Sequence, residues 1–446
     1  MSNKPIFCAL AFGSASINSY GDYIPCCNIH IDEWKMRVRD GDTELANLDP
    51  KDRINESDLK EVRNGLINGV WPKPCYKCKD AESIGAPSTR TIWNNGLKEY
   101  DIPMVEHVDP NNIRFLDLTI STKCNSKCMT CGPALSDFWD QEYWQTWKIK
   151  ESQRSIIKRN CINIEDAKKL SEDFPNLRNI AFVGGEPTIA DSHHAYLNLL
   201  IENGTSKEIT LSYVTNLTGL SNELIALWKN FKAVHVSVSV DAYGKVNEYI
   251  RYPFKWEKIE ANMRKLSILR TESKDVTFTL GLSCTVSLFN AIQCFDLLEF
   301  WLDLGIEYGT PSVENPYFPG TFVNRVFFPY YTILELLPIE YRLRGLERAQ
   351  RVLDKIEWYK EQGNTNITDD FAYSIKQVMS WLQVPQRTDH GSKRWLTQLK
   401  HFTSSSDTFR KRDIKDYIPE LYEELEKLYK EQNISGFDVM RIPVGP

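Results

Sequence analysis

The chain has 446 residues, of which 42% are hydrophobic and 26% charged, so it is long enough for two or three domains and has a soluble, globular composition. The formal net charge of -6 gives no clear signal for binding to nucleic acid or to an anionic membrane. No stretch approaches the ~20 apolar residues of a membrane span, and the apolar stretch 6–12 lacks the features of a signal peptide. Eleven cysteines without a secretory signal indicate a reducing compartment. We therefore expect a cytoplasmic protein whose clustered thiols bind metal.

The first hundred residues carry a cysteine set of their own. Cys8 is followed by Cys26 and Cys27, and Cys75 and Cys78 form a CxxC pair. Four thiolates suit zinc and iron–sulfur clusters alike. Cys8, Cys26, Cys75 and Cys78 are therefore candidate ligands either of a rubredoxin-like or zinc-ribbon site or of an iron–sulfur cluster. Cys27 is a spare thiol that could replace Cys26.

From about residue 113 the pattern changes to strands that alternate with helices. Six apolar or alternating runs are predicted to be strands, at 113–120, 180–183, 209–214, 233–240, 276–286 and roughly 306–313. Helical patterns lie between them at 165–174, 192–202, 222–229, 256–269 and 291–304. Repeated strand–helix–strand units require right-handed crossovers, so we predict an α/β fold with a parallel sheet.

A second cysteine set follows the first of these strands. The sequence KCNSKCMTCG places Cys124, Cys128 and Cys131 in a CxxxCxxC loop. Thiolate is the ligand that iron–sulfur clusters select. A structural zinc or a fully ligated four-iron cluster needs four protein ligands, so this loop either borrows a distant ligand or leaves one metal open for a substrate. A zinc loop completed by a histidine or another cysteine is the alternative.

The segment GGEP comes directly after the next predicted strand and contains Gly184, Gly185 and Glu186. Glycine lets backbone carbonyls approach a bound amine closely, and the carboxylate can hold a charge nearby. A CxxxCxxC loop at the end of one strand and GGEP at the end of the next together resemble the radical S-adenosylmethionine (SAM) enzymes.

This resemblance implies a six-unit partial (β/α)6 barrel with its site at the carboxyl ends of the strands. It implies a [4Fe–4S] cluster on the three-cysteine loop, with the fourth iron bound by SAM. It further implies contacts to SAM from the strand ends, and the residues that match are Gly184, Gly185, Glu186, Thr215, Asn216, Ser239, Asp241 and Arg251. Among these, Asp241 matches a ribose-hydroxyl position and Arg251 an arginine that meets the SAM carboxylate. Taken singly, each has a structural alternative as a helix cap, an ion pair or a turn former.

The spacing from Cys8 through Gly21 to Cys26 is similar to the opening of the twitch and SPASM auxiliary-cluster domains. That resemblance implies an auxiliary [4Fe–4S] cluster on the N-terminal cysteines. In the family such domains follow the barrel, whereas these cysteines precede it. We predict an auxiliary domain at 1–105, a radical SAM core at 106–328 and a helical C-terminal region at 329–446.

The C-terminal region has helical patterns at 334–362, 370–381 and 418–432. A basic interval at 387–415 is interpreted as a solvated face rather than an anion-binding patch. The adjacent His193 and His194 point about 100° apart on a helix, so we interpret them as structural.

The favoured function is a radical SAM enzyme that cleaves SAM reductively to a 5′-deoxyadenosyl radical and abstracts a substrate hydrogen. A peptide or protein is favoured over a small molecule as substrate, by analogy with the twitch and SPASM relatives. The expected electron donor is a protein of the flavodoxin or ferredoxin type. The alternative is a zinc-binding or scaffold protein without catalytic activity, in which both cysteine sets are structural.

Overall fold

The structure is a computed structural model that describes residues 4–29, 49–83, 87–151, 162–308, 321–364, 367 and 369–434. Its centre is an eight-stranded sheet with the order β10-β9-β7-β6-β5-β3-β1-β2, and every neighbouring pair is parallel except β1 and β2. The strands are β1 (Ser14–Ile17), β2 (Tyr23–Ile24), β3 (Phe115–Ser121), β5 (Asn179–Gly184), β6 (Thr210–Thr215), β7 (Ala233–Ser239), β9 (Thr277–Val286) and β10 (Thr321–Arg325). The prediction of an α/β fold with a mainly parallel sheet is confirmed.

Helices connect the strands, and their positions follow the sequence patterns. The crossovers contain α9 (Ile164–Asp173), α10 (Asp191–Glu202), α11 (Asn222–Trp228), α12 (Gly244–Ile250), α13 (Trp256–Glu272) and α14 (Cys294–Glu307). Five of these six confirm the predicted helices, and α12 was not predicted. Helix α9 begins in a capping box, in which Asn163 accepts the N–H of Asp166 and Asp166 accepts the N–H of Asn163.

The prediction of the sixth strand at 306–313 is wrong where the structure describes it. Residues Ile306 and Glu307 end helix α14, and residues 309–320 lie outside the described residues. The run CFDLLEFWLDLGIE buries apolar side chains at helical spacing, which favours helix to its last turn. The sixth strand of the predicted series is instead β10, whose sequence TFVNR is rich in β-branched and aromatic residues.

The N-terminal residues form part of the same sheet. Strand β1 pairs in parallel with β3. The helices of this part of the chain are α1 (Ala9–Gly13), α3 (Pro50–Arg53), α4 (Ser57–Ile67), α5 (Tyr76–Ser83) and α6 (Thr89–Gly96), and α1 contacts β1, α4 and α6. A hydrophobic cluster that includes Phe12, Val62 and Leu66 packs on Phe115 of β3. The predicted domain limits at 105 and 328 stay predictions.

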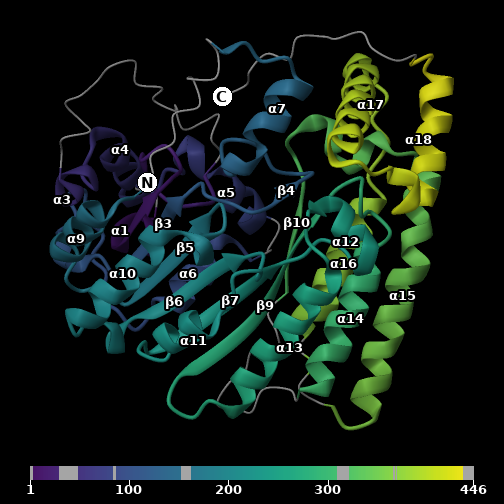
Figure 1. Cartoon of the computed structure of the whole chain (residues 1–446). Helices are drawn as coiled ribbons and strands as arrows, with labels where there is room; N and C mark the ends of the chain where they lie inside the picture. Colours follow the sequence, from purple (N-terminus) through teal and green to yellow (C-terminus); the bar gives the residue numbers. More distant parts are fainter. Residues whose placement is uncertain are drawn as a thin grey trace.

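The C-terminal region is helical, as predicted, and stacks beside the sheet (Figure 1). It contains α15 (Ile339–Glu361), α16 (Asp369–Leu382), α17 (His390–Arg410) and α18 (Pro419–Glu431). The sequence patterns predicted α15, α16 and α18. Helix α17 was missed, because its second half, TSSSDT, is poor in strong helix formers. In the part of the chain that the structure covers, no helix combines the length and apolar character needed to cross a membrane.

Candidate active site

The three-cysteine loop lies at the carboxyl end of β3 and is anchored by a small second sheet. Strand β4 (Lys127–Cys128) pairs with β8 (Arg251–Tyr252), so Cys128 lies directly opposite Arg251. The Met129 N–H donates to the Ile250 carbonyl over 2.8 Å, and the Cys131 N–H donates to the Cys128 carbonyl over 3.0 Å. These backbone hydrogen bonds fix the cysteine loop relative to β8.

Residues just after the loop fold back and hold it. The carboxylate of Asp137 accepts the Cys124 N–H over 3.1 Å, and the Trp139 indole N–H donates to the Cys128 carbonyl over 3.1 Å. The hydroxyl of Ser136 donates to the Ser126 carbonyl over 3.0 Å. These residues were not predicted as supports of the loop.

The thiols lie close enough to influence one another. Burial raises the pKa of Cys124 to about 12, and the neighbouring Cys128 adds to this. Burial, Cys128 and Cys124 likewise raise the pKa of Cys131 to about 12. Iron binds thiolate, so loading this loop at neutral pH releases protons.

The glycines of GGEP pack directly on the chain that leads into the loop. Gly184 has a φ of +105°, and a Cβ on Gly185 would overlap the carbonyl oxygen of Lys123. The N–H groups of Gly185 and Glu186 donate to the carbonyls of Ser121 and Lys123 over 2.9 and 2.8 Å. The two motifs are thus joined backbone to backbone, and the second positions the first.

Glu186 is buried and connects the ends of β5 and β6. It accepts hydrogen bonds from the Thr188 N–H (3.2 Å) and hydroxyl (2.5 Å), the Thr215 hydroxyl (2.6 Å) and the Asn216 N–H (2.6 Å). Three of these bonds fall on Oε1 and one, from the Asn216 N–H, on Oε2, so Oε2 keeps a free acceptor position. Burial raises the pKa of Glu186, and the donors partly offset this. The structure therefore brings together three predicted site residues, Glu186, Thr215 and Asn216.

An amide and hydroxyl network carries this connection into the cysteine loop. The Asn216 side chain donates to Asn125 over 3.0 Å, and Asn125 donates to the Thr218 hydroxyl over 2.9 Å. Thr218 in turn donates to Asn216 over 2.6 Å. Asn125 and Thr218 were not predicted, since no local pattern pairs residues about ninety positions apart.

The predicted pair Asp241 and Arg251 lies beside Cys128, where the two side chains bind each other. Arg251 donates from Nε to Oδ2 over 2.7 Å and from Nη2 to Oδ1 over 3.1 Å. Burial lowers the pKa of Arg251, but the nearby Asp241 and Cys128 outweigh it and raise the pKa overall. Ser239 ends β7 and is partly exposed. The roles of Ser239, Asp241 and Arg251 toward SAM stay predictions.

A buried ion pair between α7 and the C-terminal region packs against the cysteine loop. Glu142 of α7 (Asp140–Thr146) accepts Arg410 Nε over 2.8 Å, and both side chains are fully buried. Lys127 Nζ lies 3.4 Å from Glu142, and Arg410 Nη1 lies 3.3 Å from Met129 Sδ. The interpretation of residues 387–415 as a solvated face is therefore wrong for Arg410. Burial also lowers the pKa of the nearby Arg412 to about 10.

The four N-terminal cysteines line one cavity. Cys8 precedes α1, Cys26 lies on the loop after β2, Cys75 ends a short 3₁₀ helix and Cys78 lies in α5. Asn94 clamps the backbone on both sides of Cys8, since it accepts the Ala9 N–H over 2.8 Å and donates to the Phe7 carbonyl over 3.1 Å.

Cys26 and Cys27 face different surroundings. Cys26 shares the cavity with the other cysteines, and burial raises its pKa well above the usual value. Cys27 interacts with Asp117 of β3, whose pKa burial raises to about 6. Within the described ranges, no group of three or more His, Cys, Asp or Glu side chains is already arranged around a single-ion site.

One face of the sheet carries small and polar side chains. Neighbouring strands align Asp117, Ala181, Ser212, His235 and Thr279 in one row across β3 to β9. Along β7 and β9 the positions on this face are partly exposed, whereas the alternate positions are buried in the main core.

His193 is buried on α10 and its Nε2 lies 2.9 Å from the Tyr213 hydroxyl. Burial lowers its pKa to about 3. This contact with a core tyrosine confirms the structural interpretation of His193.

Residues 118–282 match the family described as the Radical SAM superfamily. The matched segment runs from within β3 to within β9 and contains the three-cysteine loop, GGEP and Arg251. No curated protein matches the chain.

Three solved structures are similar at low identity. Native anSMEcpe with bound AdoMet is 17% identical over 57% of this chain and 62% of that chain, with a TM-score of 0.37. Streptococcus suis SuiB bound to the precursor peptide SuiA is 16% identical over 64% of this chain and 57% of that chain, with a TM-score of 0.34. SuiB bound to S-adenosylmethionine is 18% identical over 69% and 60%, with a TM-score of 0.34. The chain spans about three fifths of the length of these proteins.

Proposed function

We propose that the chain is a radical SAM enzyme whose cluster is held by Cys124, Cys128 and Cys131. The observation that carries the proposal is the three-thiol loop at the carboxyl end of β3, joined to GGEP within the segment that matches the Radical SAM superfamily. Bound there, a [4Fe–4S] cluster and SAM would supply a 5′-deoxyadenosyl radical that abstracts a substrate hydrogen.

The protein's own residues position and enclose these groups. The cysteine thiolates would bind three irons, and the strand ends would meet SAM through Gly184, Gly185, Glu186, Thr215, Asn216, Ser239, Asp241 and Arg251. Glu186 fixes Thr215 and Asn216 by accepting their hydrogen bonds, and its Oε2, which accepts only the Asn216 N–H, is the oxygen we propose for SAM. The buried pair of Glu142 and Arg410 would support the loop from behind.

We further propose a peptide or protein substrate. Small-molecule pockets are lined mostly by apolar side chains with few polar groups. The face beside the cysteine loop instead presents Ser212, His235, Ser237 and Thr279 and is open along β7 and β9. Such a surface suits a peptide backbone, which needs many hydrogen-bond partners.

The N-terminal cysteines are proposed to bind an auxiliary [4Fe–4S] cluster in a twitch-like arrangement. Cys8, Cys26, Cys75 and Cys78 line one cavity, and the neighbouring Cys27 interacts with the buried Asp117 of β3. The described cysteines are free thiols, which suits a cytoplasmic setting and a flavodoxin- or ferredoxin-type electron donor.

The test is anaerobic reconstitution followed by incubation with SAM and dithionite. We expect a brown iron–sulfide protein that forms 5′-deoxyadenosine, measured by liquid chromatography. A colourless protein that holds only zinc would support the structural alternative. An iron–sulfide protein that leaves SAM intact would also contradict the proposal.

A further inference from the structure

All three guanidinium nitrogens of Arg251 have partners. Nε and Nη2 bind Asp241, and Nη1 points to the Cys128 sulfur over 3.7 Å. The side chain is only 12% exposed. We infer that Arg251 is a positioning residue that donates an N–H···S hydrogen bond to Cys128 and so sets the reduction potential of the cluster. This inference rests on the proposed function.

The backbone fixes this approach. Cys128 and Arg251 are opposed residues of β4 and β8, and opposed side chains of an antiparallel pair lie on the same side. The adjacent bond from the Met129 N–H to the Ile250 carbonyl, 2.8 Å long, extends the pairing. A flexible surface arginine would have no such constraint.

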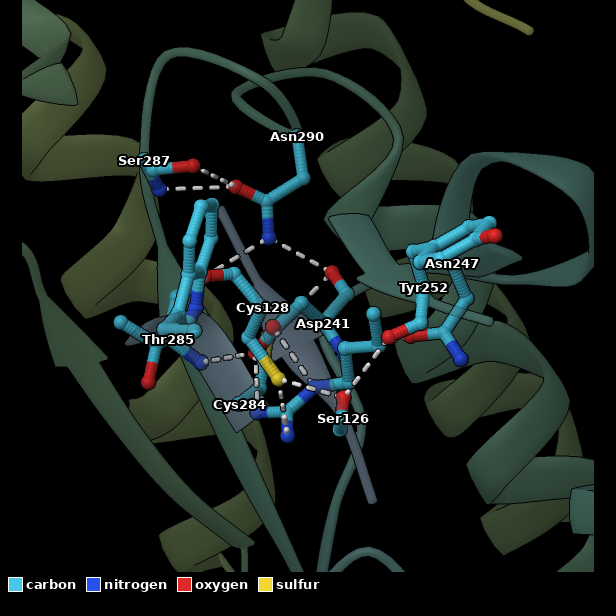
Figure 2. A network of polar contacts seen from close by, with 11 residues as sticks. Ser126, Cys128, Asp241, Asn247, Tyr252, Cys284, Thr285, Ser287 and Asn290 are labelled. Atoms are coloured by element: carbon cyan, nitrogen blue, oxygen red, sulfur yellow. Dashed lines mark hydrogen bonds and ion pairs between the residues drawn. The ribbon is translucent and has the colours of Figure 1, made fainter. Parts of the chain in front are cut away.

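Asp241 holds the guanidinium in place and is itself held on several sides. Its Oδ1 accepts the Thr285 N–H over 2.9 Å, and its own N–H donates to Asn247 over 3.1 Å. Asn290 donates to its carbonyl over 2.6 Å (Figure 2). We assign the carboxylate to orienting Arg251, and Oδ2, which accepts only the Arg251 Nε–H, keeps an acceptor position for SAM.

A second donor is available to the same sulfur. The Ser126 hydroxyl lies 3.0 Å from Cys128 Sγ, and Figure 2 shows the two side chains together beside Asp241. The same hydroxyl also lies 3.3 Å from the Tyr252 carbonyl, which competes for its single proton. A thiolate can only accept, so a cluster-bound Cys128 would receive the Arg251 bond and compete with Tyr252 for the Ser126 bond. Of the three cysteines in the loop, Cys128 is the one that receives a guanidinium.

These hydrogen bonds affect the reduction potential of the cluster. Reduction adds one negative charge, part of which falls on the thiolate sulfurs. Hydrogen bonds to the sulfurs are one of the factors that set iron–sulfur potentials. Because Asp241 neutralises the charge of Arg251, the guanidinium has little long-range electrostatic effect. Its effect on the cluster therefore comes mainly from the hydrogen bond to Cys128. Both donors should favour the reduced cluster.

The test uses the full-length, anaerobically reconstituted protein in redox titrations followed by electron paramagnetic resonance. The signal that changes on addition of SAM identifies the cluster of the three-cysteine loop. Arg251→Lys keeps a positive charge beside Asp241, but a lysine ammonium lacks the planar guanidinium that donates to Asp241 and Cys128 at the same time. We expect the ratio of reduced to oxidised cluster at fixed potential to fall about tenfold, which is about 59 mV for one electron. Ser126→Ala should lower the ratio less.

Arg264→Lys is the control, because Arg264 forms ion pairs with Glu260 and Glu307 away from the loop. An unchanged potential in a folded, iron-loaded Arg251→Lys protein would overturn the inference. So would loss of iron from that folded variant, since Arg251 would then serve assembly. A tenfold loss of SAM affinity at constant potential would instead assign Arg251 to the SAM carboxylate.

If Arg251→Lys does not fold, the double variant Arg251→Gln, Asp241→Asn takes its place with the same expectation, because it removes both buried charges together. Wild-type protein without a cluster or without 5′-deoxyadenosine would refute the proposed function. An active wild type whose potential is insensitive to these changes would refute only this inference.

Discussion

The two cysteine sets are supported in different ways. Around Cys124, Cys128 and Cys131 the supports are polar and come from strand ends, GGEP and the Glu142–Arg410 pair. Around Cys8, Cys26, Cys75 and Cys78 the cavity wall is largely apolar, with Leu10, Val62 and Leu66 among its residues.

This difference separates two tasks. Polar groups around a three-thiol loop can orient a polar cofactor and tune the loop's charge. An apolar wall around four thiols suits a closed cluster that exchanges only electrons. The comparison therefore predicts that substitutions in the two cysteine sets have different effects on SAM cleavage and on iron content.

The largest difference is expected between two single cysteine variants. Cys128→Ala should abolish formation of 5′-deoxyadenosine, because the three-thiol loop alone leaves an iron for SAM. Cys75→Ala should still form 5′-deoxyadenosine with dithionite, but uncoupled from product. The two proteins are compared by liquid chromatography, with circular dichroism as the folding control. If both variants are folded and equally inactive, the proposed division into a catalytic and an auxiliary cysteine set is wrong.

Changing all four N-terminal cysteines to alanine should halve the iron content. The wild type should hold roughly eight irons and the variant about four, as two four-iron clusters require. Iron and sulfide analysis measures this after anaerobic reconstitution. A variant that retains all of the iron would show that the N-terminal cavity binds none.

Removing the arginine partner of Glu142 should destabilise the fold. Arg410→Met breaks a fully buried, charged hydrogen bond and leaves Lys127 as the remaining cation beside Glu142, at a cost of about 2–3 kcal/mol in the free energy of unfolding. Arg348→Met is the matched control, because it breaks a partly exposed pair with Asp296 and should cost about 0–1 kcal/mol. Urea denaturation of the metal-free proteins compares them. Equal stabilities would mean that the Glu142–Arg410 pair does not hold the C-terminal region to the loop.

A smaller effect is expected at the end of β5. Glu186→Ala removes the acceptor shared by Thr188, Thr215 and Asn216, so SAM affinity should fall about tenfold, or 1.4 kcal/mol. Iron content should stay at the wild-type value, since the carboxylate is not a cluster ligand. Calorimetry with SAM and iron analysis separate the two results, and Glu165→Ala on the exposed surface of α9 is the control. Iron lost in parallel with affinity would make Glu186 a structural residue.

The smallest effect is expected at Cys27. Cys27→Ser should leave the iron content unchanged, whereas Cys26→Ser should lose the N-terminal cluster, because Cys26 faces the other cysteines and Cys27 faces Asp117. Iron analysis of the two serine variants is sufficient. The reverse result would exchange the roles of the neighbouring cysteines.

Local patterns predicted much of this molecule. Five of the six predicted strands and all eight predicted helices are present, and the two motifs lie at the carboxyl ends of the strands, but the helices of the N-terminal hundred residues were not predicted. The pairing of Asp241 with Arg251, the contact of Asn216 with Asn125 and the burial of Arg410 could not be predicted, because each depends on a partner chosen by the fold. Strand β1 was missed for a similar reason: SASI is short, and its partner β3 lies about a hundred residues further on.

The contact between Arg410 and Met129 has a consequence for biosynthesis. These residues are 281 positions apart, yet their side chains meet directly behind the three-cysteine loop. A growing chain can pair β3, β5 and β6 early, but the loop lacks its rear wall until the end of α17 has left the ribosome. Assembly of a stable cluster should therefore follow synthesis of nearly the whole chain, and ribosome-bound fragments that end before residue 410 should hold iron poorly.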